Sequence, residues 1–586
     1  MYIELHAASA FSFLQGASLP ETLVERAAAF GYPALALLDA DGVYGAPRFH
    51  KAAKQAGLKA IIGAELTVAD AGGVGKAGGA GRWRLPVLVE SQDGYKNLCR
   101  LVTKMKMRAA KGESALSLDE FEGYTTGLVA LAGRPILDAS RYGVGGLLDR
   151  IVGLFGCKNV CVELQRHLLR DEQAANVALE SLARAFGVPV IATNDVRFAE
   201  PSDRPLFDVL TCVRNKTTLD AAGRKLARNA ERYLKSPKAM AELFADRPGA
   251  LAGTRALADR LQYTMADLGY RFPKYPVPDG ETEMSFLRHI TEAGARERYR
   301  PYHDKARAQM ARELALIEKL DLAGYFLIVW DIVNYCRQQD ILVQGRGSAA
   351  NSAVCYSLGI TAVDPIAMDL LFGRFLSEER GEWPDIDLDL PSGDRRERVI
   401  QHVYEKYGRL GAAMTANVIT YRSRSAAREV GKALSLQEDD VDRLAKVMNN
   451  FEFTDPNDTL GRHVAEAGLS LSMPRMKTFA ELWLAVQDLP RHLGQHSGGM
   501  VICQGELDAV VPLEPATMPG RVVIQWDKDD CADMGIVKVD LLGLGMMAAL
   551  QDAIELVNTG IRNQGSGIKN LRILDPRSLI PDPRSL

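Results

Sequence analysis

The stretch Pro384-Asp385-Ile386-Asp387-Leu388-Asp389-Leu390 alternates carboxylates with apolar side chains. Because successive strand residues face opposite sides of a sheet, the alternation predicts a β-strand with its carboxylates on one face and its apolar side chains on the other. Neighbouring carboxylates repel each other, and a bound cation turns that repulsion into attraction; hard oxygen ligands suit Mg²⁺. For this pattern alone, a solvated acidic edge or a lone Ca²⁺ site is the alternative interpretation.

A second stretch, Ile536-Val537-Lys538-Val539-Asp540-Leu541, has the same alternation. It predicts a strand with Lys538 and Asp540 on one face and apolar side chains on the other. If the two strands are neighbours, Asp385, Asp387 and Asp540 form a group that holds two Mg²⁺ ions about 3.5–4 Å apart. Such a pair activates an attacking hydroxyl and stabilises the leaving oxygen of a phosphoryl group.

The segment Gln344-Gly345-Arg346-Gly347-Ser348 precedes an apolar helical stretch at 353–358. Its glycines let backbone N–H groups approach phosphate oxygens, Ser348 can donate a hydrogen bond, and Arg346 supplies positive charge. A G-x-G pattern by itself is usually a tight turn. Together, a phosphate cradle, a carboxylate strand and a Lys-x-Asp strand are the parts that phosphoryl transfer needs, namely positioning and charge neutralisation.

Basic residues follow in a third element. Tyr421-Arg422-Ser423-Arg424 opens a predicted helix in which Arg424, Arg428 and Lys432 are four residues apart and therefore lie on one face. A solvated face is the default interpretation of such a stripe. Beside a phosphoryl-transfer site, a track for the DNA backbone becomes the better account. His496 either reaches a phosphate or is a structural turn histidine.

The chain has 586 residues and a mass of 64.0 kDa, which corresponds to about three to five domains. Residues 1–270 alternate apolar runs with helical stretches, as a parallel α/β domain does. The runs that read as buried strands are 34–38, 59–62, 85–89 and 188–192. Three prolines within 272–280 predict an extended linker. Residues 418–495 look helical and 496–545 return to strands, which predicts a helical insertion that splits one α+β domain.

The composition excludes several classes of protein. Hydrophobic residues make up 47% and charged residues 25%, as in ordinary folded proteins. The net charge of −3 excludes a uniformly basic nucleic-acid coat, so binding to a polyanion must use local patches. No apolar run approaches the roughly 20 residues of a membrane helix, and the N-terminus lacks the basic region of a signal peptide. Eight scattered cysteines without zinc-cluster spacing predict a reduced, cytoplasmic protein. The lack of a membrane helix predicts that the protein has no membrane partner.

Four motifs resemble, in order, those of the C-family bacterial DNA polymerases, the DNA polymerase III alpha subunits: Gly345-Arg-Gly-Ser348, Pro384-Asp-Ile-Asp-Leu-Asp389, His496-Ser-Gly-Gly499 and Val537-Lys-Val-Asp-Leu-Leu-Gly-Leu544. The resemblance covers nearly all of residues 1–558 and implies a multidomain α/β and α+β fold. The implied parts are a PHP-type β/α barrel at 1–270, a polymerase-beta-like nucleotidyltransferase palm at 271–417 and 496–558, and a helical thumb at 418–495. The second palm segment includes the start of the fingers.

The resemblance also implies roles and ligands. Asp385, Asp387 and Asp540 would be the catalytic, metal-binding aspartates, with Asp389 as a neighbour. The residues implied for the incoming triphosphate are Gly347 and Ser348, with Arg346, Arg374 and Lys538 as nearby positive charge. The residues implied for DNA are Arg422, Arg424, Arg428, Lys432 and His496. The implied ligands are two Mg²⁺ ions, a primed DNA template and dNTPs. A sliding clamp and other mutagenesis proteins are the implied partners of the full-length form.

The PHP resemblance breaks down at its metal site. The family's His-x-His reads His6-Ala7-Ala8, an Asp-His-Asp reads Asp39-Ala40-Asp41, and Arg197 stands where a histidine is expected. The surviving candidate ligands are His6, Asp39, Glu65 and Asp195. These are too few for the family's metal cluster, so we predict a structural scaffold without a PHP metal ion and without phosphoesterase activity. A metal-dependent phosphoesterase is the competing function.

The eroded PHP site and the arginine-rich 421–424 segment resemble the error-prone, damage-induced branch, which implies translesion synthesis in induced mutagenesis and DNA repair. Relatives continue for several hundred residues into fingers, a clamp-binding segment and an OB domain, so we expect a C-terminally truncated chain. The atypical tail at 559–586 carries Asp-Pro-Arg-Ser-Leu twice, at 575–579 and 582–586, which indicates either non-native sequence or a disordered terminus. A replicative-type alpha subunit and a catalytically silent DNA-binding fragment are the alternatives.

Overall fold

The computed structural model describes residues 2–69, 81–110, 112–376, 384–448 and 456–563. Two compact units are present. The first unit consists of Met1–Leu268, Asn417–Gly494 and Asp508–Glu514, and the second of Gly269–Ala416, Gln495–Leu507 and Pro515–Leu586. The predicted tail at 559–586 lies outside the described residues from position 564 onward. The division of the chain into PHP, palm, thumb and tail segments stays a prediction.

The first unit contains a six-stranded sheet with the strand order β1-β2-β3-β4-β5-β6. Its strands are β1 (Ala34–Ala40), β2 (Lys59–Val68), β3 (Trp83–Val89), β4 (Leu128–Ala132), β5 (Val160–Gln165) and β6 (Val190–Thr193). The four runs predicted as buried strands are confirmed as β1, β2, β3 and β6. The predicted parallel α/β pattern holds for the pairs β1–β2, β4–β5 and β5–β6, whereas β3 is antiparallel to both β2 and β4. A parallel pairing needs a crossover that is usually a helix, and the Gly-rich sequence between β2 and β3 has low helix propensity.

The extended N-terminal segment forms backbone hydrogen bonds at both edges of this sheet. Ala36 N donates to Glu4 O at 3.0 Å on the β1 side. On the other side, Val196 N, just after β6, donates to His6 O at 2.9 Å, and Ala8 N donates to Val196 O at 2.9 Å. The segment therefore lies between β1 and the chain that leaves β6, as expected for a barrel-like arrangement. It carries His6 into the interior of the unit.

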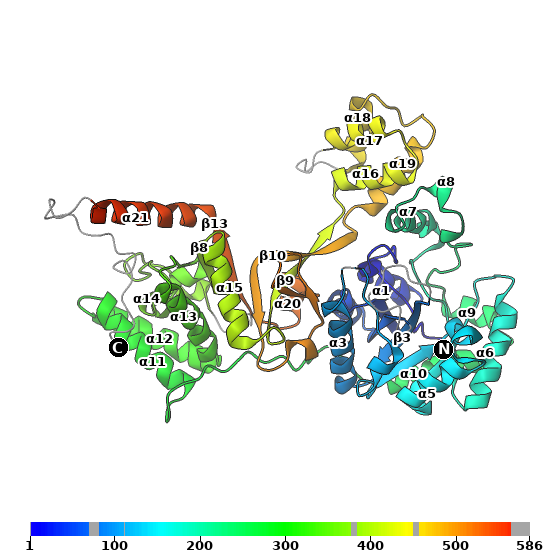
Figure 1. Ribbon diagram of the computed structural model, residues 1–586, viewed down its shortest axis with the longest axis horizontal. Helices are drawn as coiled ribbons and strands as arrows, with labels where there is room; N and C mark the ends of the chain where they lie inside the picture. Colours follow the sequence, from blue (N-terminus) through cyan, green and yellow to red (C-terminus); the bar gives the residue numbers. More distant parts are fainter. Residues whose placement is uncertain (1, 70–80, 111, 377–383, 449–455, 564–586) are drawn as a thin grey trace. The chain divides into compact units, whose positions relative to one another are not determined.

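Helices cover this sheet and form the rest of the first unit (Figure 1). They are α1 (Pro20–Ala29), α2 (Ala46–Gln55), α3 (Gln92–Met107), α4 (Ala139–Tyr142), α5 (Gly146–Phe155), α6 (Glu172–Phe186), α7 (Arg204–Arg214), α8 (Leu219–Ala222), α9 (Pro237–Leu243) and α10 (Pro248–Arg260). The stretch 418–495 contains the helices α16 (Ser423–Ala433), α17 (Glu438–Val447), α18 (Pro456–Glu466) and α19 (Met476–Val486). Its buried Ala427 and Phe479 share an apolar core with Val209 of α7.

The second unit is built on a sheet with the order β11-β12-β9-β10-β13-β8-β7. Its strands are β7 (Gln344–Arg346), β8 (Asp387–Pro391), β9 (Ala412–Thr420), β10 (Pro490–Ile502), β11 (Leu513–Pro515), β12 (Val522–Ile524) and β13 (Lys538–Leu544). The α15 helix (Asp394–Tyr407) packs on β8 and β13. The short α20 (Lys528–Asp533) precedes β13, and α21 (Gly545–Asn563) follows it.

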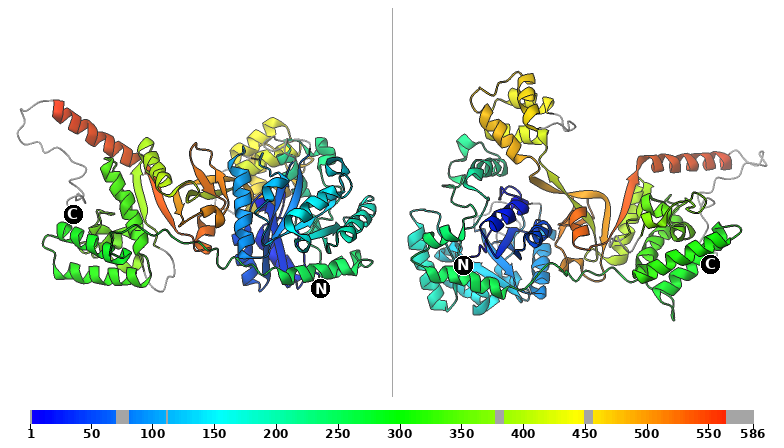
Figure 2. Two further views of the ribbon diagram at one scale, coloured as in Figure 1. Left: turned by 60° about the horizontal axis from the view of Figure 1, so that its bottom comes forward. Right: turned by 180° about the vertical axis from the view of Figure 1, so that it is seen from behind.

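A group of helices packs together beside β7 and β8 in this unit. They are α11 (Glu283–Arg298), α12 (Asp304–Lys319), α13 (Ala323–Gln338) and α14 (Ala353–Ser357), drawn in green in Figure 1 and in both views of Figure 2. The α13 helix carries the run Tyr325–Val329, in which every residue is buried. Tyr325 Oη accepts a hydrogen bond from Ile386 N at 3.1 Å, so the helix group fixes the start of the acidic strand. Over the described residues, helices long and apolar enough to span a bilayer are absent.

Candidate active site

The β8 and β13 strands bring the predicted carboxylates together. They pair in parallel, and Asp540 is the register partner of Asp387. Carboxylate oxygens of Asp385, Asp387 and Asp540 lie within 4.8 Å of one another. Asp540 is 4% exposed, Asp387 is half-buried, and Asp385 is exposed. Asp385 precedes β8 instead of lying on it, so the cluster opens to solvent at that residue.

Charge repulsion within the cluster affects the pKa of Asp387 and the contacts that Lys538 makes with its carboxylates. Burial, followed by the charges of Asp385 and Asp540, raises the pKa of Asp387 to about 6. Lys538 Nζ donates to Asp385 Oδ1 at 2.9 Å and also to Asp540 Oδ2. Burial opposes the charge of the lysine, but its hydrogen bonds and attraction to these two carboxylates raise the pKa of Lys538 overall. The ammonium therefore neutralises only part of the negative charge.

The remaining oxygens fit a divalent cation. Asp540 Oδ1 is buried and has no hydrogen-bond partner among the described residues. An unpaired buried carboxylate oxygen is costly unless a cation or a donor reaches it. Asp385 and Asp387 offer further oxygens on the solvent side, and oxygen donors are what Mg²⁺ and similar hard cations bind. The donor set therefore suits a divalent metal ion held between β8 and β13.

Two glycines of β10 make room for Asp540. Gly499 is its register partner across the antiparallel β10–β13 pair. A Cβ at Gly499 would lie 2.3 Å from Thr415 Oγ1 and 3.1 Å from Asp540 Oδ1. A Cβ at Gly498 would lie 2.4 Å from Leu542 Cδ2. The Gly-Gly pair of the His496 motif thus has a steric role, because a side chain there would collide with Leu542 or Thr415 and crowd the carboxylate of Asp540.

The predicted phosphate cradle borders the same carboxylates. Arg346 is paired with Asp387 in the β7–β8 register, and its Nε lies 3.2 Å from Asp389 Oδ1 and 4.0 Å from Asp387 Oδ2. Asp389 thus faces an arginine, which separates it from the three clustered aspartates. Gly347 has φ of +67°, a left-handed conformation that favours glycine. Ser348 Oγ donates to Asp385 O at 3.1 Å.

Arg374 lies on a short 3-10 helix, Phe372–Arg374, and is exposed. This turn contacts the 3-10 helix Gly347–Asn351, which carries the cradle. The structure thus brings Arg374 to the neighbourhood of the cradle. Its role as positive charge for a triphosphate stays a prediction.

The four basic residues predicted to bind DNA lie in the first unit, at the start of α16 and along it. Arg422, Arg424, Arg428 and Lys432 are all exposed, while Ala426, Ala427 and Val430 are buried. The predicted single basic face is therefore present. Arg422 bonds to Asp488, and Arg428 Nη2 lies 3.9 Å from Asp442 Oδ1. Isolated surface ion pairs of this kind contribute little, so the cations remain able to contact an anion.

His496 lies on β10 in the second unit and uses one ring nitrogen internally. Gly498 N and Gly499 N donate to His496 Nδ1 at 3.2 and 2.7 Å. Since Nδ1 accepts these bonds, the ring proton resides on Nε2. Nδ1 lies 3.7 Å from Asp540 Oδ1. The arrangement agrees with the structural interpretation of this histidine, and its contact with DNA stays a prediction.

In the first unit, His6, Glu65 and Asp195 form a buried cluster. Arg197 donates from Nη1 to Glu65 Oε2 at 2.8 Å and from Nη2 to Glu65 Oε1 at 2.7 Å, and its Nη2 lies 2.5 Å from Asp195 Oδ1. His6 Nε2 lies 2.8 Å from Glu65 Oε1, and His6 Nδ1 lies 2.6 Å from Glu163 Oε1. Burial disfavours the imidazolium, but Glu163 and Asp195 raise the pKa of His6 well above its usual range.

The charges of this cluster are balanced by the protein itself. His6, Arg197 and Arg232 oppose the carboxylates of Glu65, Glu163 and Asp195. Burial works against ionised Glu65, but Arg197 and His6 hold the pKa of Glu65 well below its usual range. The Arg197 guanidinium occupies carboxylate oxygens of Glu65 and Asp195 and repels a cation. This donor set does not fit a metal ion.

Asp39 stands apart from the cluster. Its Oδ1 accepts hydrogen bonds from Ser9 N at 2.9 Å, Ser9 Oγ at 2.8 Å and Ser12 Oγ at 2.9 Å. The carboxylate thus orders the turn that follows the N-terminal segment. Of the four predicted remnants of the PHP site, the structure brings together three.

Two family descriptions match this chain. Residues 285–543 match the bacterial DNA polymerase III alpha NTPase domain, and residues 4–187 match the PHP domain. The first range contains Asp385, Asp387 and Asp540, and the second contains His6, Glu65 and Glu163 but ends before Asp195 and Arg197. Over these ranges the chain is similar to the bacterial DNA polymerase III alpha subunits and to PHP domains.

Curated proteins similar to this chain are named error-prone DNA polymerase. One from Mycolicibacterium paratuberculosis is 44% identical over 95% of this chain and 51% of the relative. One from Anaeromyxobacter sp. strain K is 41% identical over 95% of this chain and 55% of the relative. One from Bordetella parapertussis is 42% identical over 95% of this chain and 52% of the relative. The chain spans about half the length of the curated relatives it matches.

The sequence analysis did not identify several residues that contribute to these two clusters. Glu163 lies in the buried run of β5, where a single glutamate among apolar residues was the available signal. The steric role of Gly499 against Thr415 depends on strands far apart in the chain and has no local signal. The bridging position of Lys538 could be anticipated only from its place two residues before Asp540.

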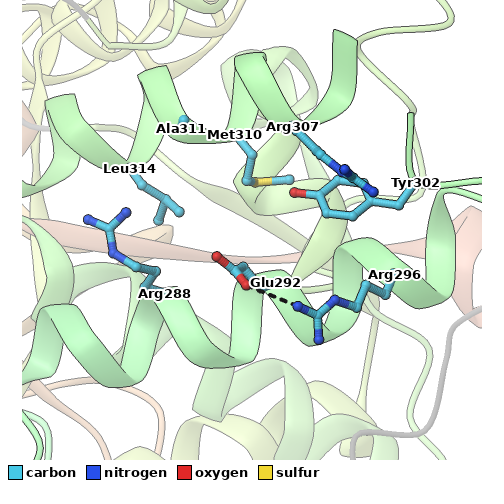
Figure 3. A pocket seen from close by; sticks show the side chains of 8 residues that line it. All are labelled: Arg288, Glu292, Arg296, Tyr302, Arg307, Met310, Ala311 and Leu314. Atoms are coloured by element: carbon cyan, nitrogen blue, oxygen red, sulfur yellow. Dashed lines mark hydrogen bonds and ion pairs between the residues drawn. The ribbon is translucent and has the colours of Figure 1, made fainter. Parts of the chain in front are cut away.

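A separate cavity of about 410 Å³ lies in the second unit, between α11 and α12. Figure 3 shows that Arg288, Glu292, Arg296 and Arg307 surround it, with Glu292 paired to Arg296 at 3.4 Å. Arg307 lies over the ring of Tyr302, at 5.1 Å from its centroid. The carboxylate cluster does not contribute to its lining.

Proposed function

We propose that this chain is the catalytic part of an error-prone, DNA-directed DNA polymerase that adds dNTPs to a primer 3′-OH and releases pyrophosphate. The observation that carries the proposal is the group of Asp385, Asp387 and Asp540, set on neighbouring strands with an unpaired buried oxygen on Asp540. The family match and the names of the relatives support the same activity.

In this proposal the three aspartates hold two Mg²⁺ ions. When bound, such a pair activates the primer hydroxyl and stabilises the charge that leaves with pyrophosphate. Backbone N–H groups at Gly347 and the Ser348 hydroxyl hold the incoming triphosphate, and Arg346 and Arg374 add positive charge. Lys538 offsets the carboxylate charge and is within reach of a phosphate oxygen beside them.

The basic face of α16, defined by Arg422, Arg424, Arg428 and Lys432, is proposed to follow the DNA backbone. A primed template and dNTPs are the substrates, and a sliding clamp and other mutagenesis proteins are the partners of the longer protein. Because its proposed substrate is DNA, we propose that the protein is located in the cytoplasm. The PHP part is proposed to be a scaffold without a metal ion or phosphoesterase activity, because Arg197 and His6 already supply its cations.

Primer extension on a primed template with Mg²⁺ and all four dNTPs tests the proposal. The Asp385→Asn/Asp387→Asn double variant should lose extension, since two of the three metal-binding carboxylates disappear while the side-chain volumes stay the same. Asp394→Asn is the matched control, because Asp394 is an exposed carboxylate at the start of α15, just after β8. Extension that survives in the double variant would refute the site.

No extension by the unaltered chain, with salt-sensitive binding of primer-template DNA, would show a silent DNA-binding fragment. In that case the electrostatic contacts of segments beyond this chain would be required for the reaction. Loss of even one preorganised contact costs roughly 10²–10³ in rate.

A further inference from the structure

A cavity of about 660 Å³ lies in the first unit, beside the ends of β1 and β2 and the start of β3. This volume is in the range of sites for small ligands. The clustered residues His6, Glu65 and Asp195 do not line it, whereas Ala40 and Asp41 of the eroded Asp-His-Asp motif do, so the cavity borders the former PHP metal site. None of the residues proposed for polymerisation lines it either.

Positive charge dominates the wall of this cavity. Its cations are Arg82, Arg84, Lys106, Arg214 and Arg491, against the carboxylates Asp41 and Glu514. Arg84 Nη1 lies 2.9 Å from Asp41 Oδ2, and Lys106 Nζ lies 3.7 Å from Glu514 Oε1. These two pairs use up the carboxylates of the lining. The other cations leave an excess of positive charge, which attracts an anion.

Two of these arginines have guanidinium N–H groups without a hydrogen-bond partner among the described residues. The side chain of Arg214, at the end of α7, makes no hydrogen bond or ion pair within the described ranges. Arg82 Nη2 donates to Glu113 O at 2.7 Å, but its Nε is buried and has no partner in the described part of the chain. An unused buried donor is unfavourable unless a ligand accepts from it. Guanidiniums match phosphate oxygens in geometry as well as in charge.

Aromatic rings complete the lining. Phe13 and Tyr44 pack edge to face with their centroids 5.0 Å apart, and half-buried Trp83 opens β3 beside Arg82 and Arg84. Aromatic faces next to cations are the combination that proteins use to hold a base and its phosphate, and stacking of one base is worth roughly 1–3 kcal/mol. A purely inorganic anion would leave these rings unused.

From this combination we infer that the cavity binds a nucleoside phosphate, with the phosphate on Arg82 and Arg214 and the base against Trp83. The ligand is a free nucleotide or the end of a DNA strand, which present the same chemistry. Binding here is independent of the carboxylate cluster and requires no metal ion. The first unit thus has a ligand role beyond that of a scaffold.

Binding measurements on the whole chain in EDTA test this inference, because chelation removes metal-dependent nucleotide binding. The probes are deoxyadenosine monophosphate and inorganic phosphate by calorimetry, and a fluorescein-labelled single-stranded oligodeoxyadenylate by anisotropy. Arg214→Glu should weaken binding of the nucleotide or the oligonucleotide about tenfold or more. Arg228→Glu is the matched control, since Arg228 is an exposed arginine of the same unit whose partner, Asp171, lies 3.3 Å away and outside the cavity.

Trp83→Leu should weaken binding of the nucleoside phosphate and leave binding of inorganic phosphate unchanged. Affinity for the monophosphate would identify a free nucleotide as a ligand, and affinity for the oligonucleotide alone would identify a strand end. Equal effects of Arg214→Glu and Arg228→Glu, or no binding of any probe, would overturn the inference. A Trp83→Leu variant with unaltered affinity would overturn the assignment of the base. Arg214→Gln removes the charge without reversing it, and it tests the same contact if the glutamate variant does not fold. It should also weaken binding.

Discussion

Arg197 donates two hydrogen bonds to Glu65, one to each carboxylate oxygen, at 2.8 and 2.7 Å inside the first unit. Replacing the arginine with methionine would leave Glu65 and Asp195 buried with too little positive charge. Breaking a buried ion pair from one side typically costs about 3–5 kcal/mol. We therefore expect Arg197→Met to lower the free energy of unfolding by that amount, measured by urea denaturation followed by circular dichroism.

Arg232→Met is the control for this variant, because Arg232 also contacts Asp195 but its side chain is 38% exposed. Its loss should cost clearly less than the loss of Arg197, since water can replace an exposed partner. Equal costs for the two variants would show that the buried fork to Glu65 is not what stabilises the cluster.

Metal removal should leave the stability of the first unit unchanged. His6, Arg197 and Arg232 oppose its buried carboxylates, so we expect no bound ion that a chelator could remove. In the Asp385→Asn/Asp387→Asn variant, which lacks two metal-binding carboxylates of the second unit, we expect the Tm to be the same after dialysis against EDTA and after dialysis against Zn²⁺ or Mn²⁺. Stoichiometric Zn²⁺ or Mn²⁺ that survives gel filtration, found by elemental analysis and lost in a Glu65→Gln variant, would contradict this expectation.

Comparing the predicted and observed positions of particular residues shows which features the sequence could predict. The period-two alternation around Asp387 and Asp540 predicted two strands and their acidic faces, because that periodicity is local. The pairing of these two strands is not local, since a long helical insertion separates them, and it followed only from the family resemblance. The loss of histidines at Ala8 and Arg197 was visible in the motif. The two-pronged contact of Arg197 with Glu65, and the presence of Glu163 beside His6, depended on strand register that no local pattern reports.

Lys538 competes with a metal ion for the carboxylate cluster, since its ammonium bonds to both Asp385 and Asp540. Lys538→Gln should therefore tighten binding of a divalent cation. One removed charge interaction of about 1 kcal/mol in a water-exposed site corresponds to roughly fivefold in affinity. Mn²⁺ binding followed by electron paramagnetic resonance would measure it. The same substitution should slow primer extension, because it removes positive charge beside the triphosphate. Weaker Mn²⁺ binding in this variant would show that the lysine orients the carboxylates instead of competing for them.

Gly499 is expected to be intolerant of even one added methyl group. A Cβ there would lie 2.3 Å from Thr415 Oγ1 of β9 and 3.1 Å from Asp540 Oδ1 of β13, so β10 or these two side chains must move. Overpacking of this kind costs about 1–3 kcal/mol, and the shift would displace the buried aspartate. Gly499→Ala should thus lower both the free energy of unfolding and the rate of primer extension.

Gly545→Ala is the matched control, because a Cβ at Gly545 meets no atom within 4 Å. Thr415→Ser/Gly499→Ala would not relieve the clash, since serine keeps the hydroxyl, whereas Thr415→Ala/Gly499→Ala removes that atom and should recover part of the lost stability. Full stability and activity in the Gly499→Ala single variant would mean that the close approach of β10 is not needed to hold Asp540 in place.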